Sequence, residues 1–155
     1  MSVPKIVVHT DVLVRHLSGR QTPSVLRFAL QKFFCYTTVF QAIEAFSFGR
    51  SARELQAIDD AMASLKVLGL NPKNARRYGG LIREKGKKNQ WSALIAGMCD
   101  ESRLPILTDR VRDFRDFPGL VIVPTRMVAK YTTGEEILEV ARNAGLKRRG
   151  EKLKG

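Results

Sequence analysis

The 155-residue chain lacks a long hydrophobic run. No apolar stretch approaches the roughly 18 to 20 residues that a membrane-spanning helix requires. The first residues, MSVPKIVVHTD, also lack the apolar core of a secretory signal peptide, because Lys5 interrupts them. We therefore expect a cytoplasmic protein that does not enter a membrane.

Cysteine is equally scarce, with Cys35 and Cys99 as the two examples. Two cysteines are too few for a disulfide scaffold, and these two lack the close spacing of a zinc site. Both are expected to be small buried hydrophobic residues. General disorder is excluded as well, because 44% of the residues are hydrophobic and can build a single core.

Acidic residues are few compared with basic ones. The 27 lysines and arginines exceed the 15 aspartates and glutamates, which gives a net charge of +12. Such a charge attracts polyanions through electrostatic steering and counterion release. Nucleic acid is therefore the default partner, unless the basic side chains serve only to keep the surface soluble.

Short apolar runs alternate along the chain with helical segments. The runs expected to form strands are residues 6–8, 34–36, 67–70, 105–108 and 120–123. The residues expected to open helices are Thr22 with Pro23, Thr37 or Thr38, Ser51 with Glu54, Pro72 and Asn89. Runs this apolar are typical of parallel strands buried on both faces. The sequence thus predicts a three-layer α/β fold with a short, mainly parallel sheet of about five strands flanked by helices.

The C-terminal part differs, and we divide the chain into a domain at 1–125 and a C-terminal helix and basic tail at 126–155. Thr133 and Glu136 form a capping box for a helix that Gly145 is expected to close. The residues after Gly145 contribute +4 to the net charge. This composition predicts a frayed basic arm.

Open parallel sheets place their ligand crevice at the carboxyl ends of the strands. The polar residues expected in or around that crevice are His9, Thr10, Asp11, Glu44, Ser92, Thr108, Asp109, Arg110 and Asp113. Several also have a purely structural interpretation: His9 as a half-buried, hydrogen-bonded histidine, Glu44 as a solvated residue or a partner of Arg110, and Asp113 as the cap of a turn.

Three stretches carry a family resemblance: VVHTDVLVRHL, TTVFQAIEAFSFGRSARELQAIDDAM and WSALIAGMCDESRLPILTDRVRDFRDFPGLVIV. In these stretches and their spacing, residues 4–124 resemble the PIN domain family, and in particular the VapC-type toxin ribonucleases of prokaryotic toxin–antitoxin pairs. The resemblance implies a parallel sheet between helices. It also implies a pocket of four acids that hold divalent metal for the hydrolysis of RNA phosphodiesters.

Residue by residue, this chain departs from that acidic pocket. His9 stands at the first acid, where the family opens Asp-Thr-Asn or Asp-Thr-Asp, and Asp11 fills the neighbouring polar position. Glu44 matches the second acid. Ser92 stands at the third position and Arg110 at the fourth, so the four positions sum to no net charge with His9 neutral.

A site for Mg²⁺ or Mn²⁺ needs several converging anionic oxygens. We therefore expect no metal site, with Asp11, Glu44 and Asp113 as the secondary candidates for ligands. The first hypothesis is a degenerate PIN-like protein that binds RNA or a protein partner. The alternative is an active endoribonuclease toxin that uses Asp11, Glu44 and Asp113 as catalytic residues with Mg²⁺ or Mn²⁺.

The expected partners are RNA, a small antitoxin-like protein and a second copy of the chain in a homodimer. The residues expected to contact nucleic acid are Lys87, Lys88, Arg112, Lys147, Arg148 and Arg149. Trp91 and Tyr78 are either core aromatic residues or platforms on which bases stack. A basic DNA-binding module is a third interpretation, which no recognition-helix motif supports.

Overall fold

The computed structural model describes residues 3–85 and 90–154. Its elements are β1 (Lys5–Val8), α1 (Thr10–Ser18), α2 (Val25–Lys32), β2 (Phe34–Thr38), α3 (Val39–Ser47), α4 (Ala52–Ala63), β3 (Lys66–Leu68), a 3₁₀ turn (Pro72–Asn74), α5 (Ala75–Lys85), α6 (Gln90–Ser102), β4 (Ile106–Leu107), α7 (Val111–Phe114), β5 (Ile122–Val123), α8 (Arg126–Lys130) and α9 (Gly134–Lys154). Lys87 and Lys88, expected to contact nucleic acid, and Asn89, expected to cap a helix, lie outside the described residues.

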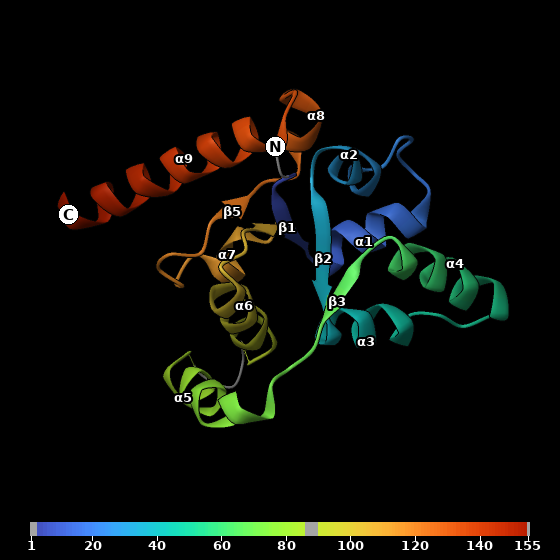
Figure 1. The fold of residues 1–155 in the computed structure, drawn as a ribbon, viewed down its shortest axis with the longest axis horizontal. Coiled ribbons are helices and arrows are strands. Elements are labelled where there is room, and N and C mark those ends of the chain that lie inside the picture. The colour runs from blue at the N-terminus through green and yellow to red at the C-terminus, as the bar shows by residue number, and fades with distance from the viewer. Residues whose placement is uncertain (1–2, 86–89, 155) are drawn as a thin grey trace.

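The described strands form one sheet in the order β3-β2-β1-β4-β5, and all of its pairings are parallel. β1 is central, with Ile6 beside Cys35 of β2 and Val7 beside Ile106 of β4. Helices cover both faces of the sheet (Figure 1). The predicted three-layer α/β fold is confirmed.

The side chains of β1 alternate between two hydrophobic clusters, as the pleat of a strand requires. Ile6 and Val8 are fully buried in a cluster to which α1, α2, α8 and α9 contribute. Val7 faces the opposite way, into a cluster with side chains of α6 and α7. β1 therefore contributes to both interior layers, and its carboxyl end lies between two sets of helices.

Capping residues set where the helices next to the sheet begin. The Ser24 hydroxyl accepts a hydrogen bond from the backbone N–H of Arg27 at 3.3 Å, so α2 begins after Ser24 and not at the predicted Thr22. Thr38 and Gln41 form a reciprocal capping box at the start of α3. The helix α3, which carries Glu44, therefore begins directly where β2 ends.

Three helices were not among the predictions: α1, α7 and α8. α1 contains the β-branched residues Thr10, Val12 and Val14, whose helix propensity is low. It forms because Val12 and Leu13 are fully buried against the core. Tertiary packing thus overrides the local preference of this segment.

The predicted end of the last helix at Gly145 is wrong, because α9 continues to Lys154 (Figure 1). One glycine inside a helix costs only about 1 kcal/mol relative to alanine, and the surrounding leucine, lysine, arginine and glutamate residues favour the helix. The first part of α9 packs on the core through Ile137, Leu138 and Ala141. None of the described helices has the length and apolarity needed to cross a membrane.

Two glycines of α9 make a matched test of this packing. An added Cβ at Gly134 would lie 2.5 Å from the backbone oxygen of Lys32, whereas one at Gly145 meets nothing within 4 Å. We expect Gly134→Ala to lower the free energy of unfolding by about 1 to 3 kcal/mol through overpacking. Gly145→Ala should raise it by up to about 1 kcal/mol. Urea denaturation measures both, and a destabilising Gly145→Ala would contradict a helix that continues past this residue.

Candidate site at the carboxyl ends of the strands

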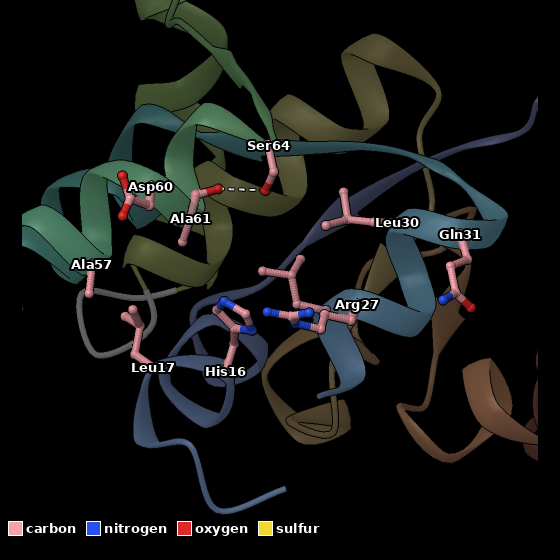
Figure 2. A pocket seen from close by; sticks show the side chains of 10 residues that line it. His16, Leu17, Arg27, Leu30, Gln31, Ala57, Asp60, Ala61 and Ser64 are labelled. Carbon is pink, nitrogen blue, oxygen red and sulfur yellow. Dashed lines mark hydrogen bonds between the residues drawn. The ribbon is translucent and has the colours of Figure 1, made fainter. Parts of the chain in front are cut away.

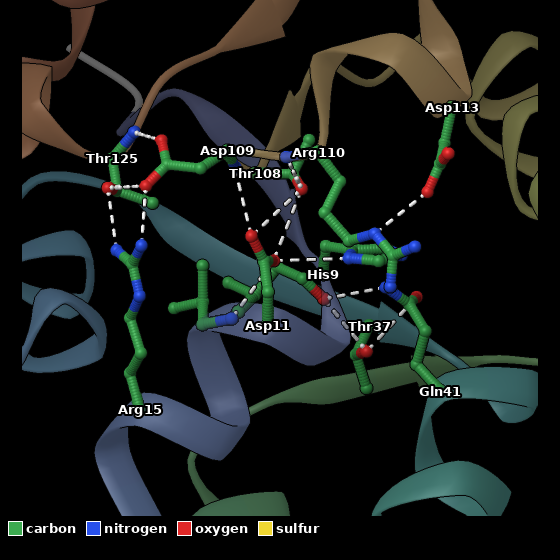
Figure 3. Close-up of polar contacts among 12 residues, drawn as sticks. His9, Asp11, Arg15, Thr37, Gln41, Thr108, Asp109, Arg110, Asp113 and Thr125 are labelled. Carbon is green, nitrogen blue, oxygen red and sulfur yellow. Dashed lines mark hydrogen bonds and ion pairs between the residues drawn. The ribbon is translucent and has the colours of Figure 1, made fainter.

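The polar residues that follow β1 and β4 lie close together at the carboxyl edge of the sheet (Figure 3). His9 and Asp11 come from the start of α1, and Thr108 and Asp109 follow β4. Glu44 lies in α3, Ser92 in the first turn of α6 and Asp113 in α7. What each of these side chains contacts determines whether it is free for chemistry.

The Asp11 carboxylate is fully engaged within the chain. Its Oδ1 accepts a hydrogen bond from the backbone N–H of Val12 at 3.0 Å and lies 3.1 Å from Nδ1 of His9. Its Oδ2 accepts from the backbone N–H of Asp109 at 2.9 Å and from the Thr108 hydroxyl at 3.1 Å. Asp11 therefore connects the end of β1 to the end of β4.

The Asp109 carboxylate is also bound by groups of the chain, from Thr125 and Arg15. Its Oδ1 accepts from the backbone N–H of Thr125 at 2.9 Å, and its Oδ2 accepts from the Thr125 hydroxyl at 2.5 Å. Nη2 of Arg15 forms an ion pair with Oδ2 at 2.8 Å. Asp109 thus connects α1 with the residue that precedes α8.

Hydrogen bonds lower the pKa of both carboxyl groups. Burial alone would raise the pKa of Asp11, but the hydrogen bonds from His9, from the backbone of Asp109 and from Thr108 outweigh it. Burial also acts to raise the pKa of Asp109, and the bonds from Thr125 and Arg15 reverse that direction. Both aspartates are therefore held ionised by groups of the chain itself.

Arg110 pairs with Asp113 and not with Glu44. Nε of Arg110 lies 2.8 Å from Oδ2 of Asp113, and the Arg110 side chain is 62% exposed. The backbone N–H of Arg110 donates to the Thr108 hydroxyl at 3.0 Å. The guanidinium group is thus held at the edge of the site by a partner one turn away.

His9 is buried, deeper than the half-buried position of its structural interpretation. The residue precedes α1 without a capping hydrogen bond from its side chain, and its ring contacts the ring of Phe114 edge-on at 5.2 Å. Thr10, the next residue, has a buried hydroxyl that finds no hydrogen-bond partner among the described residues. His9 therefore joins the Asp11 network to the hydrophobic cluster.

Among the described residues, Glu44 is the one expected acid whose carboxylate has no partner. It is half-buried, and within residues 3–85 and 90–154 its carboxylate takes part in no hydrogen bond or ion pair. Ser92 is also half-buried, and its hydroxyl has no hydrogen-bond partner in the same part of the chain. With respect to the described residues, α3 thus contributes one unpaired carboxylate to the site and α6 one unpaired hydroxyl.

Sequence reasoning missed the buried amide beneath the site. Gln41 Nε2 donates to the backbone oxygen of Val8 at 3.1 Å, and its Oε1 accepts from the backbone N–H of Thr38 at 3.0 Å. The Thr37 hydroxyl donates to the same Val8 oxygen at 3.0 Å. The Thr-x-x-Gln spacing of a capping box was the signal for Gln41, and Figure 3 shows the resulting contacts.

These residues do not fit a divalent metal. In the described part of the chain, no three His, Cys, Asp or Glu side chains converge as a metal site would require. The oxygens of Asp11 and Asp109 already accept several hydrogen bonds each, and Asp113 is paired with a guanidinium group. Mg²⁺ and Mn²⁺ need free anionic oxygens that point at one position.

The two aromatic residues considered as stacking platforms differ in exposure. Tyr78 is buried, and its hydroxyl donates to Oε2 of Glu101 at 2.6 Å, so it offers no face to a base. Trp91 is exposed. Of the residues expected to contact nucleic acid, Arg112 and Lys147 are exposed, whereas the side chains of Arg148 and Arg149 lie outside the described part.

A separate cavity of about 600 Å³ lies between α1, α2 and α4, near the opposite end of α1 from Asp11 (Figure 2). Its lining includes the apolar residues Leu17, Leu26 and Leu30 and the charged residues Arg27 and Asp60. Burial, and then the nearby charge of Arg27, lower the pKa of His16 in the same lining. The cavity therefore combines apolar surface with charged groups of both signs.

No protein-family model matches the chain, and no curated protein matches its sequence. Solved structures do match it. One matching chain comes from the structure of VapBC2 from Rickettsia felis bound to a promoter DNA fragment. It is 14% identical to this chain, with a TM-score of 0.62, and the match covers 77% of this chain and 98% of that one. A chain of DNA-bound VapBC from Salmonella typhimurium is 20% identical with a TM-score of 0.63, over 79% and 98%.

A toxin–antitoxin complex from Klebsiella pneumoniae contains a further match, 22% identical with a TM-score of 0.59, over 75% of this chain and 95% of that one. The matched chains are covered almost completely, whereas part of this chain extends beyond them. The resemblance to the PIN-like fold of VapC proteins is thus confirmed at the level of the fold.

Proposed function

We propose that this chain, which has the fold of chains in VapBC complexes, is a VapC-like protein that binds RNA and does not cleave it. The observation that carries the proposal is the engagement of Asp11, Asp109 and Asp113. Each of these carboxylates is bound by donors of the chain itself. Glu44 is then left without a second free carboxylate to share a metal ion.

The net charges of the matched positions and of the whole chain support a protein that binds RNA without cleaving it. Two-metal hydrolysis of a phosphodiester needs several converging acids, because two divalent ions must be neutralised in one place. At the four matched positions, His9, Glu44, Ser92 and Arg110 carry no net charge with His9 neutral. The chain as a whole carries +12, and this charge attracts a phosphate backbone without a bound metal.

The surface that would bind RNA includes the exposed Arg112 on α7 and the basic end of α9. The residues at Lys87 and Lys88, and those at Arg148 and Arg149, belong to this proposal by their sequence. Each such residue that meets a phosphate releases counterions when RNA binds. An RNA-binding role also agrees with the cytoplasmic location that we expect.

The basic tail provides the direct test of RNA binding. We expect a single-stranded RNA to bind with a strong dependence on salt. Changing Lys147, Arg148 and Arg149 together to Gln should reduce the slope of log K against log salt by up to about 2, or about 0.7 for each phosphate that the variant no longer neutralises. Fluorescence anisotropy at several salt concentrations measures the slope. An unchanged slope would show that these residues serve only solubility.

A small antitoxin-like protein is the second partner that we propose. The matched structures are toxin–antitoxin complexes, and the cavity between α1, α2 and α4 has room for apolar side chains of a partner. A small protein encoded beside this chain should copurify with it. Leu30→Asp, which places a charge in the lining, should release that protein. Retention of the complex by this variant would contradict the location, and Leu70→Asp, at another exposed leucine, is the matched control.

A further inference from the structure

Trp91 is the single tryptophan of the chain, and its side chain is 45% exposed. It lies outside both hydrophobic clusters of the described core. Tryptophan carries a large apolar surface that folding normally removes from water. The position of this exposed indole therefore requires an explanation other than core packing.

Phe40 supports the indole from one side. The two rings are 5.1 Å apart between centroids and cross at 87°, which is an edge-to-face contact. Phe40 is partly buried and packs against the cluster that contains Val7 and Phe114. An edge-to-face contact occupies at most one face of the indole, and 45% of Trp91 stays exposed. Because Phe40 also limits the motion of the ring, a ligand that stacks on Trp91 loses less entropy on binding.

The aromatic pair lies beside the degenerate site. Trp91 directly precedes Ser92 in the first turn of α6. Phe40 lies four residues before Glu44 in α3, on the same side of that helix. The pair therefore connects the two helices that carry two of the four matched positions.

Positive charge is available on the neighbouring element. α7 packs against α6, and it begins directly after Arg110, whose side chain is 62% exposed. Arg112 lies in α7 and is also exposed. An exposed aromatic ring and an exposed guanidinium group on two packed helices are features with which proteins hold single-stranded nucleic acid.

We infer that Trp91 is a stacking platform for an unpaired base of RNA, so that the protein prefers single strands to duplexes. The inference rests on the RNA binding proposed above and adds the class of RNA. Every base has a face that stacks on an indole, whereas bases within a duplex are already stacked on one another. Trp91 thus selects for accessible bases and not for a particular sequence.

The test uses Trp91 as its own reporter, because no other tryptophan contributes to the emission. The probes are a single-stranded RNA of about 12 nucleotides, within the site sizes of single-strand binders, and a duplex of the same sequence. We expect the single strand to quench Trp91 emission saturably and the duplex to quench it much less. Anisotropy of end-labelled RNA gives the affinities of variants that lack the indole.

Trp91→Ala should weaken binding of the single strand about 5- to 150-fold, the range for one stacked base, with a smaller effect on the duplex. Trp91→Phe should recover part of the loss. Phe34→Ala is the matched control, because Phe34 is also an exposed, paired aromatic residue but begins β2 at the opposite end of the sheet. Its affinity for RNA should equal that of the native chain.

The outcomes separate this inference from the proposed function. Salt-dependent RNA binding that leaves Trp91 emission and the Trp91→Ala affinity unchanged would overturn the inference alone. A native chain that binds no RNA at low salt would overturn the proposed function as well. An emission that shifts with protein concentration in the absence of RNA would show that a second copy covers the indole, which also overturns the inference.

Discussion

Asp11→Ala is expected to lower the free energy of unfolding by about 2 to 4 kcal/mol, since a buried polar group left unpaired costs about 1 to 3 kcal/mol. The variant leaves the buried Thr108 hydroxyl and the buried His9 ring without their carboxylate partner. Glu44→Gln is the matched control, because the Glu44 carboxylate has no partner among the described residues. It should change the stability by about 0.5 kcal/mol or less.

Urea denaturation of the two variants separates a structural carboxylate from a free one. A fully stable Asp11→Ala variant would contradict the network at the carboxyl ends of β1 and β4. The same would follow from a Glu44→Gln variant that is as unstable as Asp11→Ala.

The pH dependence of stability gives the same prediction a second measurement. The pKa of Asp11 is lowered on folding, so below neutral pH the unfolded chain binds its proton more readily than the folded chain does. The stability that Asp11 contributes is complete above its unfolded pKa of about 3.9, and it is lost as the pH falls through the lowered pKa of the folded state. Asp11→Ala should flatten this acid limb. Part of the limb should remain, because Asp109 also has a lowered pKa.

Restoring the acids is expected to create metal-dependent cleavage of RNA. The triple change His9→Asp, Ser92→Asp and Arg110→Asp brings the four matched positions from no net charge to four negative charges. Arg110→Asp also releases Asp113 from its ion pair. We expect cleavage in Mg²⁺ or Mn²⁺ to rise at least about 100-fold above background, the scale of one positioned catalytic group.

Two further variants make this result interpretable. His9→Asp places a second carboxylate beside Asp11, so the triple variant should be less stable without metal and should recover stability when metal binds the folded state. Adding Asp11→Asn removes that repulsion and restores the Asp-Thr-Asn pattern of the family. Adding Glu44→Gln should abolish the gained activity. A triple variant that folds, binds Mn²⁺ and stays at background would show that more than the acids has been lost.

The sequence predicted the strands better than the helices. The apolar runs around Ile6, Cys35 and Ile106 identify strands because few helices of this length are apolar on all sides. α1 was missed, since its valines favour a strand locally and only burial makes the segment helical. In the sequence, Gly145 is typical of a helix end. The free-energy cost of one interior glycine is small, however, and the helix-favouring residues around it outweigh that cost.

The candidate site was predicted as a set of positions but not as a set of contacts. Asp11 and Thr108 are separated by 97 positions, and no local pattern indicates that they bond. The same holds for Arg15, whose partner Asp109 lies on a different element. Whether an aspartate is free for metal or engaged by the fold depends on such distant contacts. These distant contacts are the basis on which we propose the degenerate interpretation over the catalytic one.

The measurement that tests the central claim most directly is an RNA cleavage assay on the native chain with Mg²⁺ or Mn²⁺, run beside Glu44→Gln. We predict that native protein and variant both remain at background while the native chain still binds the RNA. Multiple-turnover cleavage by the native protein that requires metal and disappears in Glu44→Gln would contradict this account. That result would favour the alternative of an active endoribonuclease, with Glu44 as one of its catalytic residues.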